Sequence, residues 1–459
     1  MIHRYQKKGL NFVLDVNSGA VHLLDDISYA VSGLLDENMG DTCPQSIIDA
    51  LPDYTADEIR EAYDELYELK KAGQLFAQDD YIDVSRYIPV NAPVKALCLH
   101  VAHDCNLRCQ YCFASTGDFG QGRKIMPPEV AKKAIDFVIA RSGKRRNIEV
   151  DFFGGEPLMA WDTVTQTVDY ARSLEEKYNK KFRFTITTNG LLLDEDKRKY
   201  INENMDNCVL SLDGRREVND EFRKTVAGTG SYDTIVPKFK ALVDERDPNL
   251  DYYARGTFTS HNLDFAEDVL SIADAGFDRL SVEPVTADPG CGYDLTEDDL
   301  PKIEAEYDRL TDIMLERRKE GKPFTFFHFM VDLDQGPCVV KRLRGCGAGY
   351  EYVAVTPDGD IYPCHQFVGK EEFKQGSVLD QSFDMDIAQK FAGMNIYSRP
   401  KCQKCWAKFY CSGGCSAANY NMNHDMNDSY DLGCEMERKR LECAIYLKAM
   451  DKICEEEAK

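Results

Sequence analysis

The stretch HDCNLRCQYCFA, residues 103–114, decides the fold of this chain. It places Cys105, Cys109 and Cys112 at a C-x3-C-x2-C spacing, on a loop too short to fold back for another thiolate. A structural zinc site needs four Cys or His ligands, so zinc would require His103 as its fourth ligand. An iron-sulfur cube accommodates three cysteines more naturally, because each cysteine binds one iron and the fourth iron can remain open.

Length, charge and cysteine content narrow the class of protein. A chain of 459 residues exceeds the size of one hydrophobic core, so we expect two or three domains. The net charge of -23 predicts neither a nucleic-acid nor a membrane partner. No apolar run approaches a membrane span and no signal peptide begins the chain, so we expect a cytoplasmic protein. Because the cytoplasm keeps thiols reduced, the 17 cysteines indicate metal binding rather than disulfide bonds.

Residues 1–90 have the pattern of a separate small module. Two apolar segments, 11–16 and 20–25, are joined by Asn17, Ser18 and Gly19, which predicts a β-hairpin. Three helices are predicted after it, near residues 27–36, 44–51 and 56–72. This order is typical of a winged helix-turn-helix. Because the module is acidic, a peptide or protein partner is favoured over DNA, and a structural cap on the main domain is the alternative.

The next region alternates short apolar runs with helical patterns, which predicts parallel β/α units. Loops after the strand ends carry the chemistry in such a sheet, and the cysteine loop follows the first strand. A helical connector at 298–345 and a Cys-rich region at 346–459, closed by a long helix, complete the chain. The barrel region is 91–297, and its predicted strands are 95–102, 147–153, 182–188, 207–213, 251–259 and 278–285.

The run CNLRCQYCFA resembles the cluster motif of the radical S-adenosylmethionine (radical SAM) enzymes. The resemblance implies a partial (β/α)6 TIM-like barrel and a [4Fe-4S] cluster on the catalytic residues Cys105, Cys109 and Cys112. It also implies that the open iron is chelated by the amino and carboxylate groups of S-adenosylmethionine. Reductive cleavage of this cofactor would then yield methionine and a 5'-deoxyadenosyl radical.

Turns after the later strands extend the resemblance. The segment 154–157 reads GGEP, as in the family, and Glu156 would accept from the methionine ammonium. The segments TNG at 188–190 and SLDG at 211–214 resemble further family turns, although each is also ordinary turn chemistry. By the resemblance, Ser211 and Asp213 would face the ribose or the substrate. Arg255, on the fifth strand, is a candidate ligand of the cofactor carboxylate, although an arginine at the edge of the core would look the same. The cofactor-binding candidates are Tyr111, Gly154, Gly155, Glu156, Ser211, Asp213 and Arg255.

The downstream cysteines resemble a SPASM domain, which carries two auxiliary [4Fe-4S] clusters and would bring the total to three. The resemblance implies that one cluster is closed by Cys402, Cys405, Cys411 and Cys434, and that the other is held by Cys346, Cys364 and Cys415. The second cluster either recruits Cys338 or keeps an open iron for a substrate cysteine. Two zinc ribbons are the alternative. The other cysteines are expected to be buried apolar residues.

The whole architecture, including the opening MIHRYQKKGLNFVLDVNSGAVHLLDD, resembles the maturases of six-cysteine (SCIFF) peptides. This resemblance implies thioether cross-linking between a cysteine sulfur and a carbon of an acceptor residue. The partners would be a Cys-rich precursor peptide, bound through leader and core, and a low-potential electron donor. The N-terminal module would be the leader-binding RiPP recognition element. The alternatives are an anaerobic sulfatase-maturing enzyme, which forms formylglycine, and a non-catalytic, zinc-stabilised peptide-binding scaffold.

Overall fold

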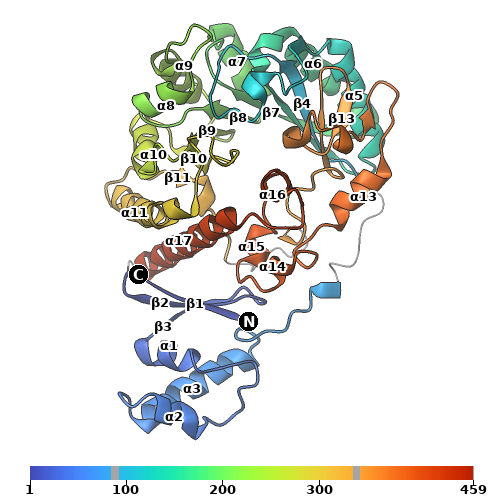
Figure 1. Cartoon of the computed structure of the whole chain (residues 1–459). Coiled ribbons are helices and arrows are strands. Elements are labelled where there is room, and N and C mark those ends of the chain that lie inside the picture. The colour runs from blue at the N-terminus through green and yellow to red at the C-terminus, as the bar shows by residue number, and fades with distance from the viewer. Residues whose placement is uncertain (84–91, 334–341, 458–459) are drawn as a thin grey trace. The chain divides into compact units, whose positions relative to one another are not determined.

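The computed structural model describes residues 1–83, 92–333 and 342–457 (Figure 1). The chain divides into two compact units. The barrel unit comprises Ile88–His328 and Cys346–Gly393, and the terminal unit comprises Met1–Tyr87, Phe329–Gly345 and Met394–Lys459. Among the described helices, none is both long and apolar enough to cross a membrane.

A parallel sheet forms the barrel unit, and its six main strands are neighbours in chain order. They are β4 (Ala96–His103), β6 (Asn147–Gly154), β7 (Lys181–Thr188), β8 (Asn207–Ser211), β9 (Asp251–Phe258) and β10 (Arg279–Pro284). Each prediction of a strand in this region is therefore confirmed. The sheet continues past β10 into β11 (Thr325–Phe326), and past β4 into β12 (Tyr352–Val355), β13 (Asp360–Tyr362) and β14 (Gly376–Ser377). The described sheet is open, so the barrel is partial, as predicted.

Helices connect the parallel strands of the barrel unit. They begin where the sequence supplies a start signal: Pro128 stands in the first turn of α5, and Asp194 accepts from the backbone of Lys197 at the start of α7. The sheet buries Phe152 and Phe184, whose rings stack 5.8 Å apart. These helices are α5 (Pro128–Arg141), α6 (Trp161–Tyr178), α7 (Glu195–Asn204), α8 (Arg216–Phe222), α9 (Tyr232–Asp244), α10 (Phe265–Asp274) and α11 (Leu300–Lys319). The short β5 (Lys124–Ile125) pairs with the end of β4, and α13 (Met385–Gly393) closes the unit.

The terminal unit begins with an antiparallel sheet in the order β1, β2, β3. Its strands are β1 (Ile2–Lys7), β2 (Leu10–Asp15) and β3 (Val21–Leu24), and the turn between β2 and β3 uses Gly19 at a φ of 75°. Three helices follow, α1 (Asp26–Ser32), α2 (Gln45–Ala50) and α3 (Ala56–Lys71). The predicted hairpin and three helices are present, whereas β1 was not predicted. A capping box between Thr55 and Glu58 begins α3.

The long last helix, α17 (Asp431–Glu457), packs against the N-terminal sheet. The ring of Phe12 lies 4.8 Å from Tyr5 and 6.3 Å from Tyr446 of α17, and His3 Nε2 lies 2.9 Å from Glu442 Oε1. Three short helices precede α17: α14 (Pro400–Gln403), α15 (Lys408–Cys411) and α16 (Ser416–Asn423). The two ends of the chain therefore share one unit (Figure 1).

Candidate functional site

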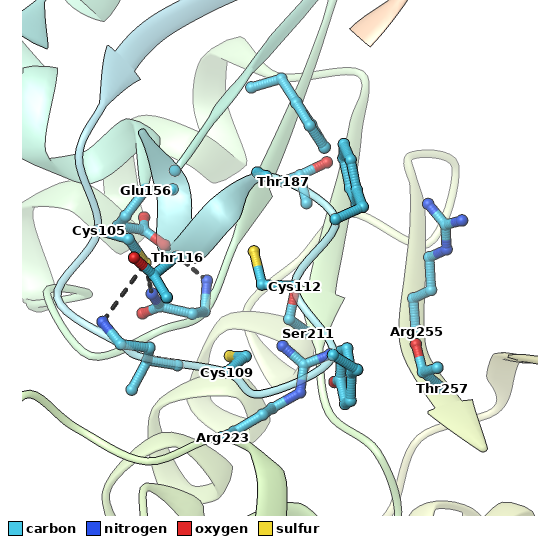
Figure 2. A pocket seen from close by; sticks show the side chains of 18 of the residues that line it. Cys105, Cys109, Cys112, Thr116, Glu156, Thr187, Ser211, Arg223, Arg255 and Thr257 are labelled. Carbon is cyan, nitrogen blue, oxygen red and sulfur yellow. Dashed lines mark hydrogen bonds between the residues drawn. The ribbon is translucent and has the colours of Figure 1, made fainter. Parts of the chain in front are cut away.

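A pocket at the carboxyl ends of the barrel strands collects the cysteines of the loop after β4. Cys105, Cys109 and Cys112 all line it, together with residues from the ends of β6, β7, β8, β9 and β10 (Figure 2). All three are free thiols. The predicted convergence of the loop with the strand ends is therefore seen in the structure.

Glycines let the cysteine loop lie directly on the neighbouring turn. A Cβ on Gly117 would come within 2.7 Å of Cys105 Cβ, and one on Gly155 within 2.1 Å of Asp104 O. Gly154 has a φ of 125°, and its added Cβ would meet Ala102 O at 2.2 Å. Two backbone bonds hold this contact, from Gly155 N to Ala102 O (2.7 Å) and from Glu156 N to Asp104 O (2.9 Å). The GGEP turn therefore supports the cysteine loop.

Glu156 is 1 % exposed and presents a carboxylate in the wall of the pocket. Its Oε1 accepts from Leu158 N (3.0 Å) and Thr188 Oγ1 (2.7 Å), and its Oε2 accepts from Asn189 N (2.8 Å). Burial raises the pKa of Glu156 to about 7, and these three donors oppose that rise. Because a carboxylate has about four lone-pair directions, Oε2 can accept one further bond, as an ammonium group would supply.

Asp213 is placed differently from the other cofactor-binding candidates. It is fully buried and is absent from the pocket lining, whereas Ser211 and Tyr111 line the pocket. Its carboxylate accepts from Tyr111 OH (2.6 Å), Arg223 Nη2 (2.9 Å) and Thr257 N (3.0 Å). Asp213 therefore holds protein groups around the pocket, and its predicted contact with cofactor or substrate stays a prediction.

The wall across from the cysteines carries charged side chains. Arg255 lies on β9, across the pocket from the cysteines (Figure 2). It forms an ion pair with Glu283 of β10, and Glu283 and His365 also line the pocket. The side chains of Arg255 and Glu283 are 47 % and 35 % exposed. Arg255 is thus within the pocket, and its predicted role toward the cofactor carboxylate stays a prediction.

The thiols of the loop suit a metal centre only as thiolates. Burial raises the pKa of Cys105 and Cys109 to about 12, so without a positive centre both would be uncharged. A metal centre reverses this preference, because a coordinating thiol is deprotonated outright. The alternative zinc ligand His103 is 1 % exposed, does not line the pocket, and places its Nε2 3.1 Å from His100 Nδ1. The donor set of the pocket therefore fits an iron-sulfur cluster with three thiolate ligands.

A second cavity lies within the terminal unit and is lined by four cysteines, which are Cys402, Cys405, Cys411 and Cys434. These are the four that the sequence groups on one auxiliary cluster. Cations also line the cavity, and Arg438 Nη1 lies 3.9 Å from Cys405 Sγ. Burial raises the pKa of Cys411 to about 12 and that of Cys434 to about 11.

The other predicted group has members in both units: Cys346 and Cys364 belong to the barrel unit, and Cys415 to the terminal unit. Cys338 lies outside the described residues. The assignment of this group stays a prediction. Among the remaining cysteines, Cys98, Cys208 and Cys443 are buried as expected. The expectation of burial is wrong for Cys291 and Cys454, which are exposed.

Several pocket residues were not found by sequence reasoning. Arg223, Thr257, Glu283 and His365 line the pocket, and none belongs to a motif that the sequence analysis used. Arg223 follows Arg215 and Arg216 closely in the chain, and nothing in one sequence separates the three. His365 directly follows Cys364, which was the only available signal for it.

Comparison with protein families agrees with this geometry. The radical SAM superfamily matches residues 99–251, which include the cysteine loop and the turns after β6, β7 and β8. A SPASM model, described as an iron-sulfur cluster-binding domain, matches residues 346–406. The chain carries a radical SAM domain and a SPASM domain. The predicted S-adenosylmethionine and iron-sulfur cofactors agree with both domains.

Relatives of this chain include maturation enzymes. The cysteine-type anaerobic sulfatase-maturating enzyme of Clostridium novyi is 25 % identical over 72 % of this chain and 90 % of its own length. The radical SAM cyclopropyl synthase TigE of Paramaledivibacter caminithermalis is 24 % identical over 72 % of this chain and 70 % of its own length.

A solved structure also shares the fold. The structure of native anSMEcpe with bound AdoMet and Cp18Cys peptide superposes with a TM-score of 0.63 at 21 % identity. The superposition covers 79 % of this chain and 99 % of anSMEcpe. It supports the radical SAM fold of the barrel unit.

Proposed function

We propose that this protein is a radical SAM peptide maturase that joins cysteine sulfurs to carbons of acceptor residues in a Cys-rich precursor peptide. The observation that carries the proposal is the pocket in which Cys105, Cys109 and Cys112 meet the buried Glu156. Peptide substrates are supported by two comparisons: a sulfatase-maturating enzyme matches over 90 % of its length, and anSMEcpe, solved with the Cp18Cys peptide, shares the fold.

Different residues of the pocket would bind the cluster and S-adenosylmethionine. The three cysteines would hold a [4Fe-4S] cluster, and Glu156 Oε2 would accept from the amino group of S-adenosylmethionine. When bound, this pair of cofactors supplies a 5'-deoxyadenosyl radical, which is the reagent for removing a hydrogen atom from carbon. Ser211, Thr257 and the ion pair of Arg255 with Glu283 line the rest of the pocket and would orient the cofactor and the peptide.

Each thioether link changes the peptide in a defined way. The acceptor carbon gives up one hydrogen atom, and the cysteine thiol gives up one proton and one electron, so one C–S bond forms and two hydrogens leave. The four-cysteine cavity in the terminal unit is suited to a fully ligated auxiliary cluster, which is a one-electron acceptor. A low-potential donor would supply the electron that cleaves S-adenosylmethionine.

The N-terminal sheet would hold the leader of the precursor. Among the described strands, β3 pairs only with β2, so its outer edge can take an added strand. Leu23 is 43 % exposed on β3 and offers an apolar contact beside that edge. Its neighbour Leu24 packs instead on the core of α1, α2 and α3.

The decisive experiment is anaerobic turnover of the reconstituted full-length protein with a short Cys-rich peptide encoded beside its gene. We expect 5'-deoxyadenosine, a peptide mass lower by two hydrogens for each link, and loss of one alkylatable thiol for each link. Cleavage of S-adenosylmethionine without any change in peptide mass would contradict the thioether proposal. A colourless protein that binds zinc and no iron would contradict the catalytic proposal and favour a scaffold.

Leader binding has its own test. Leu23→Glu should weaken binding of a fluorescent leader peptide by about 10-fold, because it places a charge at the apolar contact beside β3. Val226→Glu is the matched control, since Val226 is 65 % exposed and belongs to the barrel unit. Equal binding by both variants would place the leader elsewhere.

A sulfatase-maturing activity is the second candidate, favoured by the 25 % identity to the C. novyi enzyme over 90 % of its length. That reaction would remove sulfur from a single peptide cysteine, whereas thioether formation retains every sulfur. Mass spectrometry of the product separates the two. The variant Cys338→Ala tests a further difference between the two candidates. Loss of iron from this variant would indicate that Cys338 closes the second auxiliary cluster, and it would weaken the case for a substrate thiolate on an open iron.

A further inference from the structure

Arg223 is a largely buried cation beside the cysteine loop. Its guanidinium donates to Asp213 over 2.9 Å, and the two side chains are 11 % and 0 % exposed. It also lines the pocket, where it lies beside Cys109 (Figure 2). The Nε of Arg223 is buried and has no hydrogen-bond partner within the described chain. A buried, unpaired N–H on a charged group at a pocket wall points to an anionic occupant of that pocket.

The backbone around Arg223 is bonded to the cysteine loop. Arg108 N donates to Lys224 O over 2.7 Å, Gln110 N donates to Phe222 O over 3.3 Å, and Leu107 forms a bridge with Thr225. These contacts lie on both sides of Arg223 in the chain. The position of its side chain is therefore tied to that of the loop that carries Cys109 and Cys112.

Tyr111 completes the contact from within the loop itself. It lies between Cys109 and Cys112, and its hydroxyl donates to the same carboxylate, Asp213, over 2.6 Å. The guanidinium carbon of Arg223 lies 5.6 Å from the centre of the Tyr111 ring. Asp213 thus joins the loop and the cation at one buried point.

The positive charge of Arg223 determines its effect on a cluster bound in the pocket. A [4Fe-4S] cluster on three thiolates is an anion, and its reduced form carries one more negative charge. Arg223 lines the pocket beside Cys109, so its positive charge lies next to the position of that anion. A buried charge acts strongly on a neighbouring charge because little water screens the interaction.

We propose that Arg223 is a positioning residue that sets the reduction potential of the cluster held by Cys105, Cys109 and Cys112, with Asp213 fixing its guanidinium. The inference rests on the proposed function, because it requires that these cysteines hold an iron-sulfur cluster. Net charge and burial are among the factors that set cluster potentials. The cation raises the potential, since it stabilises the reduced cluster more than the oxidised one.

The test is an anaerobic redox titration of the reconstituted full-length protein, followed by electron paramagnetic resonance. The site cluster is identified as the one whose signal changes when S-adenosylmethionine is added. We expect Arg223→Gln to lower its midpoint potential, Arg223→Lys to stay near the wild type, and Asp213→Asn to raise it. Arg216→Gln is the matched control, because Arg216 is 60 % exposed and pairs with Asp233.

Each result decides the matter. An Arg223→Gln protein that loads the site cluster at an unchanged potential overturns the inference. If the Gln variant folds but lacks the site cluster while the Lys variant contains it, the Asp213→Asn protein decides: a raised midpoint potential supports the inference, and an unchanged one overturns it. If the Gln and Lys variants both lack it, the shape of the guanidinium rather than its charge is decisive, and the inference is overturned. A wild-type protein with no signal that responds to S-adenosylmethionine would instead contradict the proposed function.

Discussion

Asn189 donates its backbone N–H to Glu156 Oε2 over 2.8 Å, so the turn after β7 is bonded to the carboxylate that ends the turn after β6. The side chain of Asn189 reaches the cysteine loop as well, with Nδ2 2.7 Å from Asn106 Oδ1 and 3.5 Å from Cys105 Sγ. Two strand ends and the cysteine loop are thereby held in one network. This network places the buried carboxylate beside the thiols.

Glu156→Gln should disrupt that network. The new amide would turn an N–H toward groups that are themselves donors, namely Leu158 N, Thr188 Oγ1 or Asn189 N. We expect binding of S-adenosylmethionine to weaken by at least about 10-fold and stability to fall by about 1–3 kcal/mol. Equilibrium dialysis of the anaerobic protein measures the binding. Glu149→Gln, on the same strand but 43 % exposed, should bind like the wild type.

The sequence predicted most of the barrel unit because each strand is a short apolar run between turns. The runs at 95–102 and 147–153 became β4 and β6, and their carboxyl ends carry the cysteine loop and the GGEP turn as expected. Parallel strands bring their carboxyl ends to one edge, so residues from separate turns meet there. The order of the motifs along the chain was therefore enough to predict which turns meet at the pocket.

Contacts between distant parts of the chain were not predictable in this way. His3 bonds Glu442 across 439 positions, and no local pattern indicates that the first strand packs on the last helix. Arg223 was missed for a related reason, because its importance depends on the buried Asp213 and not on its neighbours in sequence. The role of Asp213 was also unforeseen, since a turn residue of this type is as often exposed.

Removal of one loop cysteine should abolish the radical chemistry alone. Cys112→Ala leaves two thiolates in the barrel pocket and does not touch the four-cysteine cavity of the terminal unit. We expect cleavage of S-adenosylmethionine to fall to background, with about one third of the bound iron lost if three clusters are present. Iron analysis and 5'-deoxyadenosine assays measure both effects. Cys291→Ala, which removes an exposed cysteine, should retain full iron and activity.

Cys434→Ala should remove an auxiliary cluster. Cys434 is in the first turn of α17 and lines the cavity with Cys402, Cys405 and Cys411, so its loss leaves three thiolates there. We expect lower iron content and a lower melting temperature, because a metal site of this kind contributes folding energy. Cys454→Ala, near the exposed end of the same helix, is the control. Identical iron contents in the two variants would remove Cys434 from the cluster.

Asp151→Asn should stabilise the protein in a pH-dependent way. Burial raises the pKa of Asp151 to about 7 from a usual value near 3.8, with Glu149 adding to the rise. The folded state therefore holds the proton more tightly, and the wild type loses stability as the pH rises from about 4 to 7. Asparagine has no such loss. Denaturation at pH 8 should favour the variant on the order of 2 kcal/mol, and the difference should shrink toward pH 5.

The control for this pH dependence is Asp196→Asn, an exposed aspartate at the start of α7. Its effect on the free energy of unfolding should be below about 0.5 kcal/mol at both pH values. A constant difference between Asp151→Asn and wild type from pH 5 to 8 would show that the stability change does not come from the Asp151 charge.

Lys408 connects the cluster-binding segment to the end of the N-terminal module. It is 3 % exposed, lies between Cys405 and Cys411 in sequence, and donates to Asp79 Oδ2 over 2.6 Å. Lys408→Met would keep the length of the side chain but leave Asp79, 27 % exposed, without its cation. Removing one partner of a buried pair leaves an uncompensated charge, so we expect destabilisation of about 2 kcal/mol and faster loss of iron to a chelator. Lys404→Met, an exposed neighbour, should change neither. If Lys408→Met matched this control in both measurements, the ion pair with Asp79 would contribute nothing to holding the cluster-binding segment.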